Sequence, residues 1–319
     1  MKAAIVESAG TAPVYADFAE PIAADGEILI DVTAAPLSQV TRARASGVHY
    51  SSSTIFPFVV GLDGAGRRRR DGKRVYFLLP RAPFGSMAER AVARESLCVP
   101  LPAAMDDVTA AAVAIPAMSS WAALTVRAKL APSEVVLING ATGISGRLAV
   151  QIAKHLGARR VIATGRNKAV LETLDADAGI LLTEDGDALE AAFKQQFDGD
   201  GVDIVLDYLW GPSAERLLQA AAKSANGDRP CRFVQIGSAS APAITLHYAA
   251  LRSRPTVMMG SGIGSVPFDA MLQSIAEVLR ATVAHGFKVA TKAVPLAEVE
   301  RQWPVDSAAE RTVFVTERN

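Results

Sequence analysis

A glycine-rich turn between an apolar run and a helical segment constrains this chain more than any other feature. The turn reads Gly140-Ala-Thr-Gly-Ile-Ser-Gly146. The apolar run Val135–Ile138 precedes it, and the segment 145–156 that follows has helical periodicity. Small residues here permit a tight turn and let backbone N–H groups approach a pyrophosphate at the positive end of the helix. The alternative is an ordinary strand-to-helix turn with three convenient glycines. Because a strand pattern precedes and a helix pattern follows, the motif predicts a dinucleotide-binding site.

Strand and helix patterns alternate around this turn from residue 134 onward, which is typical of a parallel sheet covered on both faces. Three further runs have the pattern of strands of that sheet: Arg160–Ala163, Val202–Leu206 and Arg232–Ile236. The first hundred residues are instead β-rich, with alternation over 27–33 and a tight-turn signal at Asp71-Gly72. The sequence therefore predicts an α/β fold, with a doubly wound parallel sheet and a second, β-rich domain.

The segment between these two parts is predicted to be helical. Asp106–Thr109 can cap an alanine-rich helix, and a second helical stretch runs from Ser119 to about Lys129, beyond Pro116. The apolar run Val108–Met118 is shorter than the roughly 20 residues that a spanning helix needs. At the N-terminus, the acidic residue Glu7 comes too early for the apolar stretch of a signal peptide. We therefore expect no targeting or membrane segment.

Composition excludes several classes of protein. The 319 residues carry 33 Lys plus Arg and 33 Asp plus Glu, so the net charge is zero, unlike that of a dedicated nucleic-acid binder. Two cysteines cannot form a disulfide framework or a four-thiolate zinc site, which favours a reducing compartment and a cytoplasmic protein. The run Arg67–Arg70 could be a nucleic-acid patch, but the zero net charge favours a β-hairpin strand before the turn at Asp71.

The residues after the second strand of the parallel sheet indicate NADPH rather than NADH. Enzymes that use NAD usually carry an acid here to hold the ribose 2′-hydroxyl. This strand instead runs into Gly165-Arg-Asn-Lys168, and the first acid afterwards is Glu172, inside the next helix. Arg166 can bind a 2′-phosphate, with Lys168 as a second cation.

One competing family is excluded by its own motif. Short-chain dehydrogenases use a similar turn, but they place it near the N-terminus and need a Tyr-x-x-x-Lys pair. The five tyrosines of this chain are followed four residues later by Ala19, Thr54, Pro80, Pro212 and Arg252, never by Lys.

The chain resembles the zinc-independent quinone oxidoreductase branch of the medium-chain dehydrogenase/reductase superfamily, over essentially its whole length. The motifs that carry the resemblance are Phe58–Gly66, Gly85–Glu89, Ala111–Pro116 leading to Ser119–Trp121, Val135–Gly157, Gly201–Asp207 and Val234–Ser238. The resemblance implies a GroES-like catalytic domain built from both chain ends (1–117 and 256–319) and a Rossmann domain between them (118–255). It also implies a homodimer, for which Thr256–Met259 would supply an edge strand.

Zinc-dependent members of the superfamily carry Gly-His-Glu where this chain has Gly61-Leu62-Asp63, and Leu62 cannot ligate a metal. The four histidines show no ligand spacing. We therefore expect no metal.

Carried over to this chain, the resemblance and the motifs above give a set of cofactor-binding candidates: Ser119, Gly143, Ile144, Ser145, Gly165, Arg166, Asn167, Lys168, Tyr208, Ile236, Gly237, Ser238, Gly260, Ser261 and Gly262. The substrate side departs from the family. Ser38 stands where relatives usually have Asn, and Ala43 where they have Tyr, which leaves Ser38, Thr41 and Tyr50 as catalytic candidates.

The function that this resemblance implies is hydride transfer from NADPH to a quinone or an α,β-unsaturated carbonyl, without zinc. A conjugated acceptor is already electrophilic, so it needs less activation than an alcohol. The expected partner is a small molecule, and neither nucleic acid nor a membrane. Two alternatives stay open: an enoyl-thioester reductase, and a non-catalytic NADPH-binding sensor that kept only the nucleotide site.

Overall fold

The structure is a computed structural model that describes residues 1–47, 55–305 and 307–316. The chain forms two compact units. Unit 1 comprises Met1–Ile115 with Ile275–Asn319, and unit 2 comprises Pro116–Ser274.

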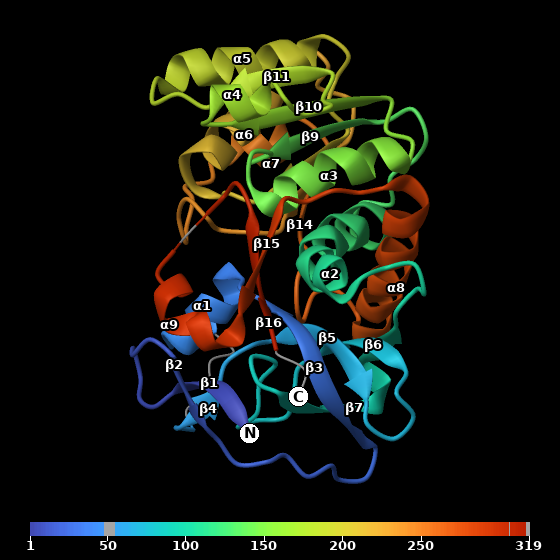
Figure 1. Cartoon of the computed structure of the whole chain (residues 1–319). Helices are drawn as coiled ribbons and strands as arrows, with labels where there is room; N and C mark the ends of the chain where they lie inside the picture. The colour runs from blue at the N-terminus through green and yellow to red at the C-terminus, as the bar shows by residue number, and fades with distance from the viewer. Residues whose placement is uncertain (48–54, 306, 317–319) are drawn as a thin grey trace. The chain divides into compact units, whose positions relative to one another are not determined.

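Unit 2 is built around a six-stranded parallel sheet in the order β11-β10-β9-β12-β13-β14. Figure 1 labels β11, β10, β9 and β14 of this sheet. The strands are β9 (Val135–Asn139), β10 (Arg160–Gly165), β11 (Ala178–Leu181), β12 (Ile204–Asp207), β13 (Cys231–Gln235) and β14 (Thr256–Gly260). The chain builds outward from β9 to β11, then returns to place β12 on the other side of β9. The strand order therefore reverses between β9 and β12, which confirms the doubly wound sheet.

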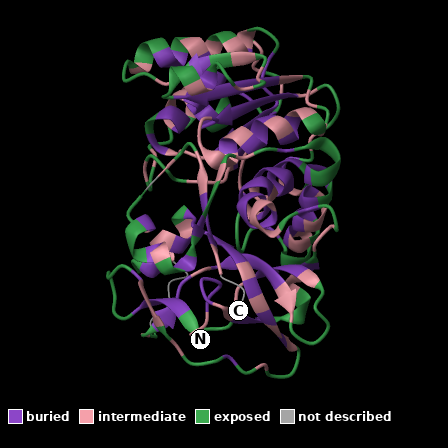
Figure 2. Cartoon of the chain, viewed as in Figure 1, coloured by how far each residue is buried: buried purple, intermediate pink, exposed green. Residues whose placement is uncertain are grey.

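Helices cover this sheet and bury most residues of its four central strands. They are α3 (Ile144–His155), α4 (Lys168–Leu171), α5 (Gly186–Asp198), α6 (Gly211–Ala222) and α7 (Ala249–Arg252). Helices α5 and α6 bring Phe193, Phe197 and Leu217 into one core with strand residues such as Leu137 and Val205. All five residues of β9 are buried, as expected of a strand covered on both faces, and Figure 2 shows the middle of this sheet mostly in purple.

One helix, rather than the two predicted, occupies the segment before this sheet. Helix α2 (Asp107–Ala122) contains Pro116 and continues into a π-type turn, η2 (Ala123–Arg127). A proline inside a helix removes one backbone hydrogen bond, but burial of the alanine-rich part, with residues 110–114 fully buried, stabilises the uninterrupted helix.

By length and composition alone, the segment Asp107–Arg127 is apolar enough to cross a membrane, with a mean hydropathy of 1.4 over its best window. It is longer than the apolar run that the sequence suggests because the helix continues beyond the proline. Of that window, 67% is buried inside the protein, and core helices that never enter a membrane pass the same test.

Unit 2 extends to Ser274, past the domain boundary expected between residues 255 and 256. The stretch 255–267 is rich in proline and glycine, which suggests a separator. It contains β14, which pairs with β13 from Cys231↔Thr256 to Gln235↔Gly260 and so becomes the edge strand of the parallel sheet.

Unit 1 contains two sheets and both ends of the chain. A three-stranded sheet has the order β2-β1-β4, and a seven-stranded sheet has the order β15-β16-β3-β5-β6-β8, with β7 also paired to β3. The strands are β1 (Lys2–Val6), β2 (Val14–Asp17), β3 (Glu27–Pro36), β4 (Phe58–Val59), β5 (Asp63–Arg68), β6 (Arg74–Leu78), β7 (Arg90–Arg94), β8 (Cys98–Pro100), β15 (Thr291–Pro295) and β16 (Arg311–Val315). The late strand β16 pairs antiparallel with the early strand β3, so the last residues complete a sheet that the first ones begin.

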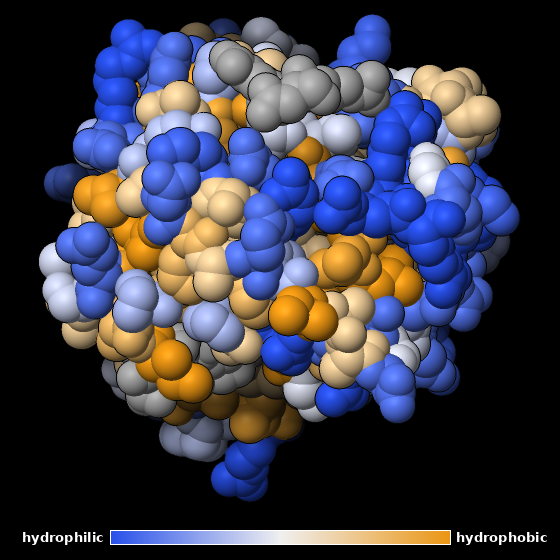
Figure 3. Space-filling model, turned by 60° about the horizontal axis from the view of Figure 1, so that its bottom comes forward, coloured by the Kyte–Doolittle hydropathy of each residue, from blue (hydrophilic) through white to orange (hydrophobic). Residues whose placement is uncertain are grey.

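Short helices connect the strands of unit 1. They are α1 (Gln39–Ala45), η1 (Glu95–Leu97), η3 (Leu296–Glu298) and α9 (Val299–Gln302). Helix α8 (Phe268–His285) begins in unit 2 and continues into unit 1. On the face of the molecule that Figure 3 shows, hydrophobic side chains gather in patches between hydrophilic ones.

The run Arg67–Arg70 ends β5 and enters the turn to β6, where Gly72 has a φ of +69°. The hairpin interpretation is therefore confirmed. Arg69 pairs with Asp31 at 3.3 Å, and Arg70 pairs with Glu95.

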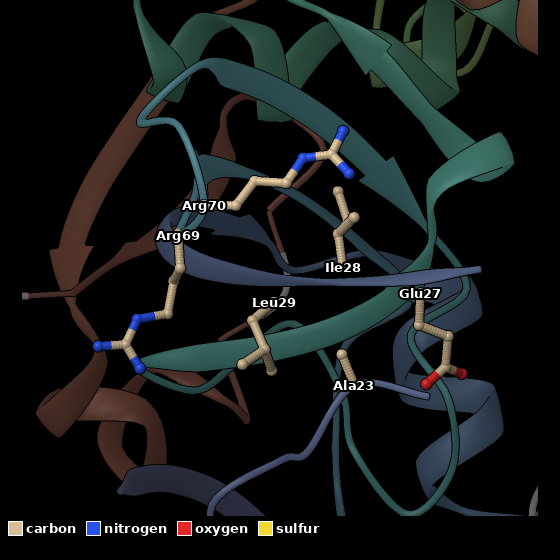
Figure 4. A pocket seen from close by; sticks show the side chains of 6 residues that line it. All are labelled: Ala23, Glu27, Ile28, Leu29, Arg69 and Arg70. Atoms are coloured by element: carbon tan, nitrogen blue, oxygen red, sulfur yellow. The ribbon is translucent and has the colours of Figure 1, made fainter. Parts of the chain in front are cut away.

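Arg69 and Arg70 also line a surface hollow of about 530 Å³, together with Ala23, Glu27, Ile28 and Leu29 (Figure 4). Glu27 is itself paired, with Arg81 at 2.9 Å. The charged groups around this hollow are thus already matched, and none of the predicted site residues lines it.

Candidate functional site

The predicted phosphate loop connects β9 to α3 and leaves the start of that helix open to a ligand. Gly140 begins the loop with a φ of +95°, a conformation that a residue with a Cβ rarely adopts. Gly143 is the N-cap of α3, and no side chain caps the first N–H groups. Uncapped N–H groups at the positive end of a twelve-residue helix fit an anion such as a pyrophosphate.

Two other glycines allow the close packing that shapes this loop. A Cβ at Gly146 would lie 2.6 Å from the Cα of Ala141 and closer still to the carbonyl oxygen of Gly140. At Gly165, a Cβ would overlap the Thr142 side chain. At Gly143, by contrast, the nearest protein atom to an added Cβ would be 4.0 Å away. The loop is therefore packed tightly on its inner side and open at its cap.

A buried hydrogen-bond network under the loop joins the ends of three strands. The Thr164 hydroxyl accepts from the Gly140 N–H (3.1 Å) and donates to the Asn139 side-chain oxygen (2.9 Å). The Asn139 amide donates to the Asp207 carboxylate at 2.8 Å. Asp207 also accepts from the backbone N–H groups of Leu209 and Trp210, each at 3.1 Å. The network fixes the loop after β9 against the loop after β12.

Asp207 is fully buried, and desolvation raises the pKa of its carboxyl even though these donors oppose the shift. Sequence reasoning missed Asn139, Thr164 and Asp207 as functional residues. The signal available for them was their position, since each lies at or within one residue of the carboxyl end of its strand.

The residues after β10 are the ones predicted to bind a 2′-phosphate. Arg166 is exposed and, within the part of the chain that the structure describes, its guanidinium forms no hydrogen bond or ion pair. Lys168 lies 3.8 Å from Glu172, at an exposed position. Asn167 is the N-cap of α4 and accepts from the Val170 N–H at 3.1 Å. The side chains of Arg166 and Lys168 are therefore available to a ligand, whereas Asn167 has a local structural role as a helix cap.

Tyr208 follows β12 at the point where the strand order reverses. Its hydroxyl lies 2.8 Å from that of Ser120, and burial raises the pKa of Tyr208 to about 12, so its phenol stays protonated at neutral pH. The neighbouring Ser119 hydroxyl donates to the Pro116 carbonyl at 2.7 Å. Sequence reasoning named Ser119 and missed Ser120.

The remaining cofactor candidates follow β13 and β14. The N–H groups of Ile236 and Gly237 donate to the Asp207 carbonyl oxygen at 2.8 and 3.1 Å, and a Cβ at Gly237 would lie 2.6 Å from the Tyr208 carbonyl oxygen. Ser238 is exposed.

Arg127 in η2 donates to the Gly260 carbonyl at 2.8 Å, and the Ser261 N–H donates to the Gln235 carbonyl at 2.8 Å. The Gly262 N–H donates to the Ser265 hydroxyl at 2.8 Å. Apart from Ser119, all the cofactor candidates thus gather at the carboxyl edge of the parallel sheet, where doubly wound folds bind ligands.

The catalytic candidates belong to unit 1. Ser38 is the N-cap of α1; its hydroxyl accepts from the Thr41 N–H at 2.9 Å and lies 2.7 Å from the Thr41 hydroxyl. Tyr50 lies outside the described residues. A cavity of about 50 Å³ is lined by Thr41, Arg44 and Leu62, among others. The structure therefore brings two of the three candidates together and places Thr41 at a cavity.

Comparisons with known proteins agree with this geometry. Residues 146–279 match the family model described as zinc-binding dehydrogenase. A relative from Emericella nidulans, named a probable NADPH-dependent quinone reductase (tdiC), is 27% identical over 99% of this chain and 100% of its own length. The quinone oxidoreductase from Thermus thermophilus, whose structures include a complex with NADPH, is 26% identical with a TM-score of 0.80, over 99% of this chain and 100% of that chain. These findings support the quinone oxidoreductase branch of the medium-chain dehydrogenase/reductase superfamily.

The chain also resembles part of a much larger protein. It is 34% identical, over 44% of its length, to a phenolphthiocerol/phthiocerol polyketide synthase of Mycobacterium tuberculosis, of which the match covers 6%.

The description of the matching family mentions zinc, so we asked whether the residues of this chain could hold a zinc ion. Leu62 is buried and lines the cavity, and Asp63 is buried and accepts from the Tyr76 hydroxyl at 2.7 Å. Among the residues that the structure describes, no group of three His, Cys, Asp or Glu side chains could hold a metal ion.

Proposed function

We propose that this protein is an NADPH-dependent oxidoreductase that delivers hydride to a quinone or an α,β-unsaturated carbonyl, without zinc. The observation that carries the proposal is the open, uncapped start of α3 at the reversal of the strand order, beside the exposed Arg166. The relatives named as quinone reductases, including one solved with NADPH, support it.

The residues present fit NADPH. The N–H groups of Ile144 and Ser145 at the start of α3 would bind the pyrophosphate, and Arg166 with Lys168 would bind the 2′-phosphate. No carboxylate follows β10 before Glu172, so nothing there repels that phosphate. When bound, NADPH supplies a hydride, and the two electrons that it carries reduce the conjugated acceptor.

On the substrate side, the chain must orient the acceptor and stabilise the negative charge that develops on its oxygen. The paired hydroxyls of Ser38 and Thr41 can donate one hydrogen bond outward, because only one of the two protons is needed for the bond between them. A proton from this pair or from water then completes the reduction.

A second candidate function is the reduction of an enoyl thioester. The match to a polyketide synthase favours it, because polyketide chains grow as thioesters. The third interpretation, a sensor that binds NADPH without turnover, is motivated by the replacement of the family's usual Asn and Tyr by Ser38 and Ala43.

The test is a fluorescence titration with NADPH and NADH, followed by addition of 1,4-benzoquinone or 9,10-phenanthrenequinone. We expect tighter binding of NADPH, turnover of a quinone, and a loss of about tenfold or more in NADPH affinity in Arg166→Ala, with NADH binding unchanged. Binding without turnover of quinone or enone would favour the enoyl thioester or the sensor interpretation. If neither nucleotide binds, the proposal is wrong.

A further inference from the structure

The small cavity of unit 1 contains a charge that the protein itself does not neutralise. Arg44 on α1 lines this cavity and is partly buried. Within residues 1–47, 55–305 and 307–316, its guanidinium forms no hydrogen bond and no ion pair. Burial lowers the pKa of this guanidinium, with no carboxylate to oppose the shift. A cation that is partly removed from water and has no partner costs stability in proportion to its burial, and a bound anion would remove that cost.

The neighbouring arginine on the same helix shows what a structural role looks like. Arg42 donates to the carbonyl oxygens of Trp303 and Val305 and stacks on the Trp303 ring at 5.7 Å. Residues two apart on a helix point in different directions, so α1 gives one arginine to packing and one to the cavity. Packing therefore accounts for Arg42 and leaves Arg44 without an explanation.

The apolar walls of the cavity strengthen the attraction between the Arg44 charge and an anion, and the geometry of the guanidinium selects the kind of anion. Besides Arg44 and Thr41, its lining is mostly apolar and includes the buried residues Phe58, Val60 and Leu62. Water screens a charge poorly between such walls, so an anion there would be bound strongly. A guanidinium presents its N–H groups in a planar fork that matches the two oxygens of a carboxylate.

The size of the cavity decides which part of a substrate enters it. Its volume of about 50 Å³ is far below the roughly 300–1,000 Å³ of pockets that enclose a whole drug-sized ligand. A quinone ring does not fit, so the reacting carbonyl stays outside. A terminal carboxylate, with three heavy atoms, does fit.

We propose that Arg44 and this cavity bind a carboxylate carried by the substrate, so that the preferred acceptor is an anionic quinone or enone. This inference rests on the proposed function and narrows its substrate class. It makes Arg44 a residue of substrate specificity, while the Ser38 and Thr41 hydroxyls remain beside the reacting carbonyl.

The test compares matched acceptors that differ only in charge. Benzylideneacetones with a meta or para carboxylate, and their methyl esters, are each reduced with saturating NADPH. We expect at least one acid to exceed its ester in kcat/KM by about tenfold or more, mostly through KM. In Arg44→Met that preference should disappear, while the rate with the ester stays unchanged. Arg280→Gln removes an equal charge from an exposed site of unit 1 and should keep the preference.

The melting temperature of Arg44→Met provides a second readout, because removal of an arginine with a structural role would lower it. Since the Arg44 guanidinium has no partner among the described residues, Arg44→Met should not lower the melting temperature. A lower melting temperature together with an unchanged acid preference would overturn the inference.

The remaining outcomes separate this inference from the proposed function. Equal reduction of acids and esters by the wild type would refute the carboxylate site and leave the reductase standing. A kcat that falls equally for both in Arg44→Met would show that Arg44 acts on the reacting oxygen instead, and would also refute it. If no acceptor is reduced, calorimetric binding of the acids and esters to wild type and Arg44→Met decides: acid binding that requires Arg44 supports the site, and its absence refutes it.

Discussion

Gly143 at the N-cap of α3 and Gly146 in its first turn should respond differently to substitution by alanine. In Gly146→Ala, the new Cβ would lie 2.6 Å from the Cα of Ala141, about 1 Å inside an ordinary carbon–carbon contact. The atoms that it meets are backbone atoms, which cannot move aside as a flexible side chain does. Overpacking of this kind costs about 1–3 kcal/mol, which exceeds the stabilisation of about 1 kcal/mol that alanine usually gives over glycine in a helix.

Gly143→Ala is the matched control. Gly143 has an ordinary φ of −80°, and an added Cβ would find its nearest protein atom 4.0 Å away. We therefore expect the free energy of unfolding to change by less than about 1 kcal/mol. The methyl group would instead occupy space that the loop leaves open for a phosphate. We expect NADPH to bind at least about tenfold more weakly, which corresponds to about 1.4 kcal/mol.

The assay is urea denaturation followed by tryptophan fluorescence, since Trp121 and Trp210 belong to unit 2, together with titration of each variant with NADPH. Gly146→Ala should lose stability, and Gly143→Ala should lose affinity while keeping its denaturation midpoint. Wild-type NADPH affinity in Gly143→Ala would refute the assignment of this helix start to the cofactor. Wild-type stability in Gly146→Ala would refute the packing argument.

Three further outcomes are expected. Burial raises the pKa of Asp63 from 3.8 to about 6, so its contribution to stability is complete below about pH 4 and is lost as the pH rises through 6; a shift of about 2 pKa units corresponds to about 3 kcal/mol. Between pH 4 and pH 7.5, the free energy of unfolding of the wild type, measured by urea denaturation, should fall by that amount relative to that of Asp63→Asn. The same pH dependence in both proteins would contradict the raised pKa of Asp63. Tyr208→Phe leaves the Ser120 hydroxyl without its partner and should cost about 1 kcal/mol in the same assay; no change would mean that the bond contributes nothing. We also propose that edge strand β14 forms a homodimer; Val257→Lys, at a side chain that is 51% exposed, should then convert a dimer into a monomer in light scattering, and a monomeric wild type would exclude it.

The elements predicted well are those whose pattern is long or is bounded by clear signals. Helix α3 lies within one residue of the predicted segment 145–156 because its helical periodicity follows a clear glycine turn, and β9 lies within one residue of the run Val135–Ile138 because that run is apolar and β-branched. Strand β14 is the edge strand expected at Thr256–Met259, but its place in the parallel sheet of unit 2 was not evident, because Pro255 and Gly260 beside it resemble a linker. Pro116 suggested a helix end for a local reason, and burial of the surrounding helix overrides that preference.

The residues of the candidate site likewise include some that the sequence predicts and some that it does not. The phosphate loop was predictable because its function depends on backbone conformation, and glycine spacing encodes that conformation. The network of Asn139, Thr164 and Asp207 was not, because it depends on β9 lying between β10 and β12, a strand order that no local pattern specifies. Arg44 was missed for a related reason. The sequence shows two arginines two residues apart but not which of them finds a partner.

The two parts of the candidate site differ in how completely the protein satisfies its own polar groups. Under the phosphate loop, the side chains of Asn139, Thr164 and Asp207 are all hydrogen-bonded, so the loop is held in shape before a ligand arrives. At the cavity of unit 1, the Arg44 guanidinium lacks a partner, and so does the buried Ser86 hydroxyl, which a Cβ at the lining residue Gly61 would contact; both statements concern the described residues. An unsatisfied polar group in a native structure calls for an explanation, and at a cavity a ligand can supply one. The cofactor side is therefore held in shape before its ligand arrives, and the cavity retains polar capacity for the carboxylate that we propose.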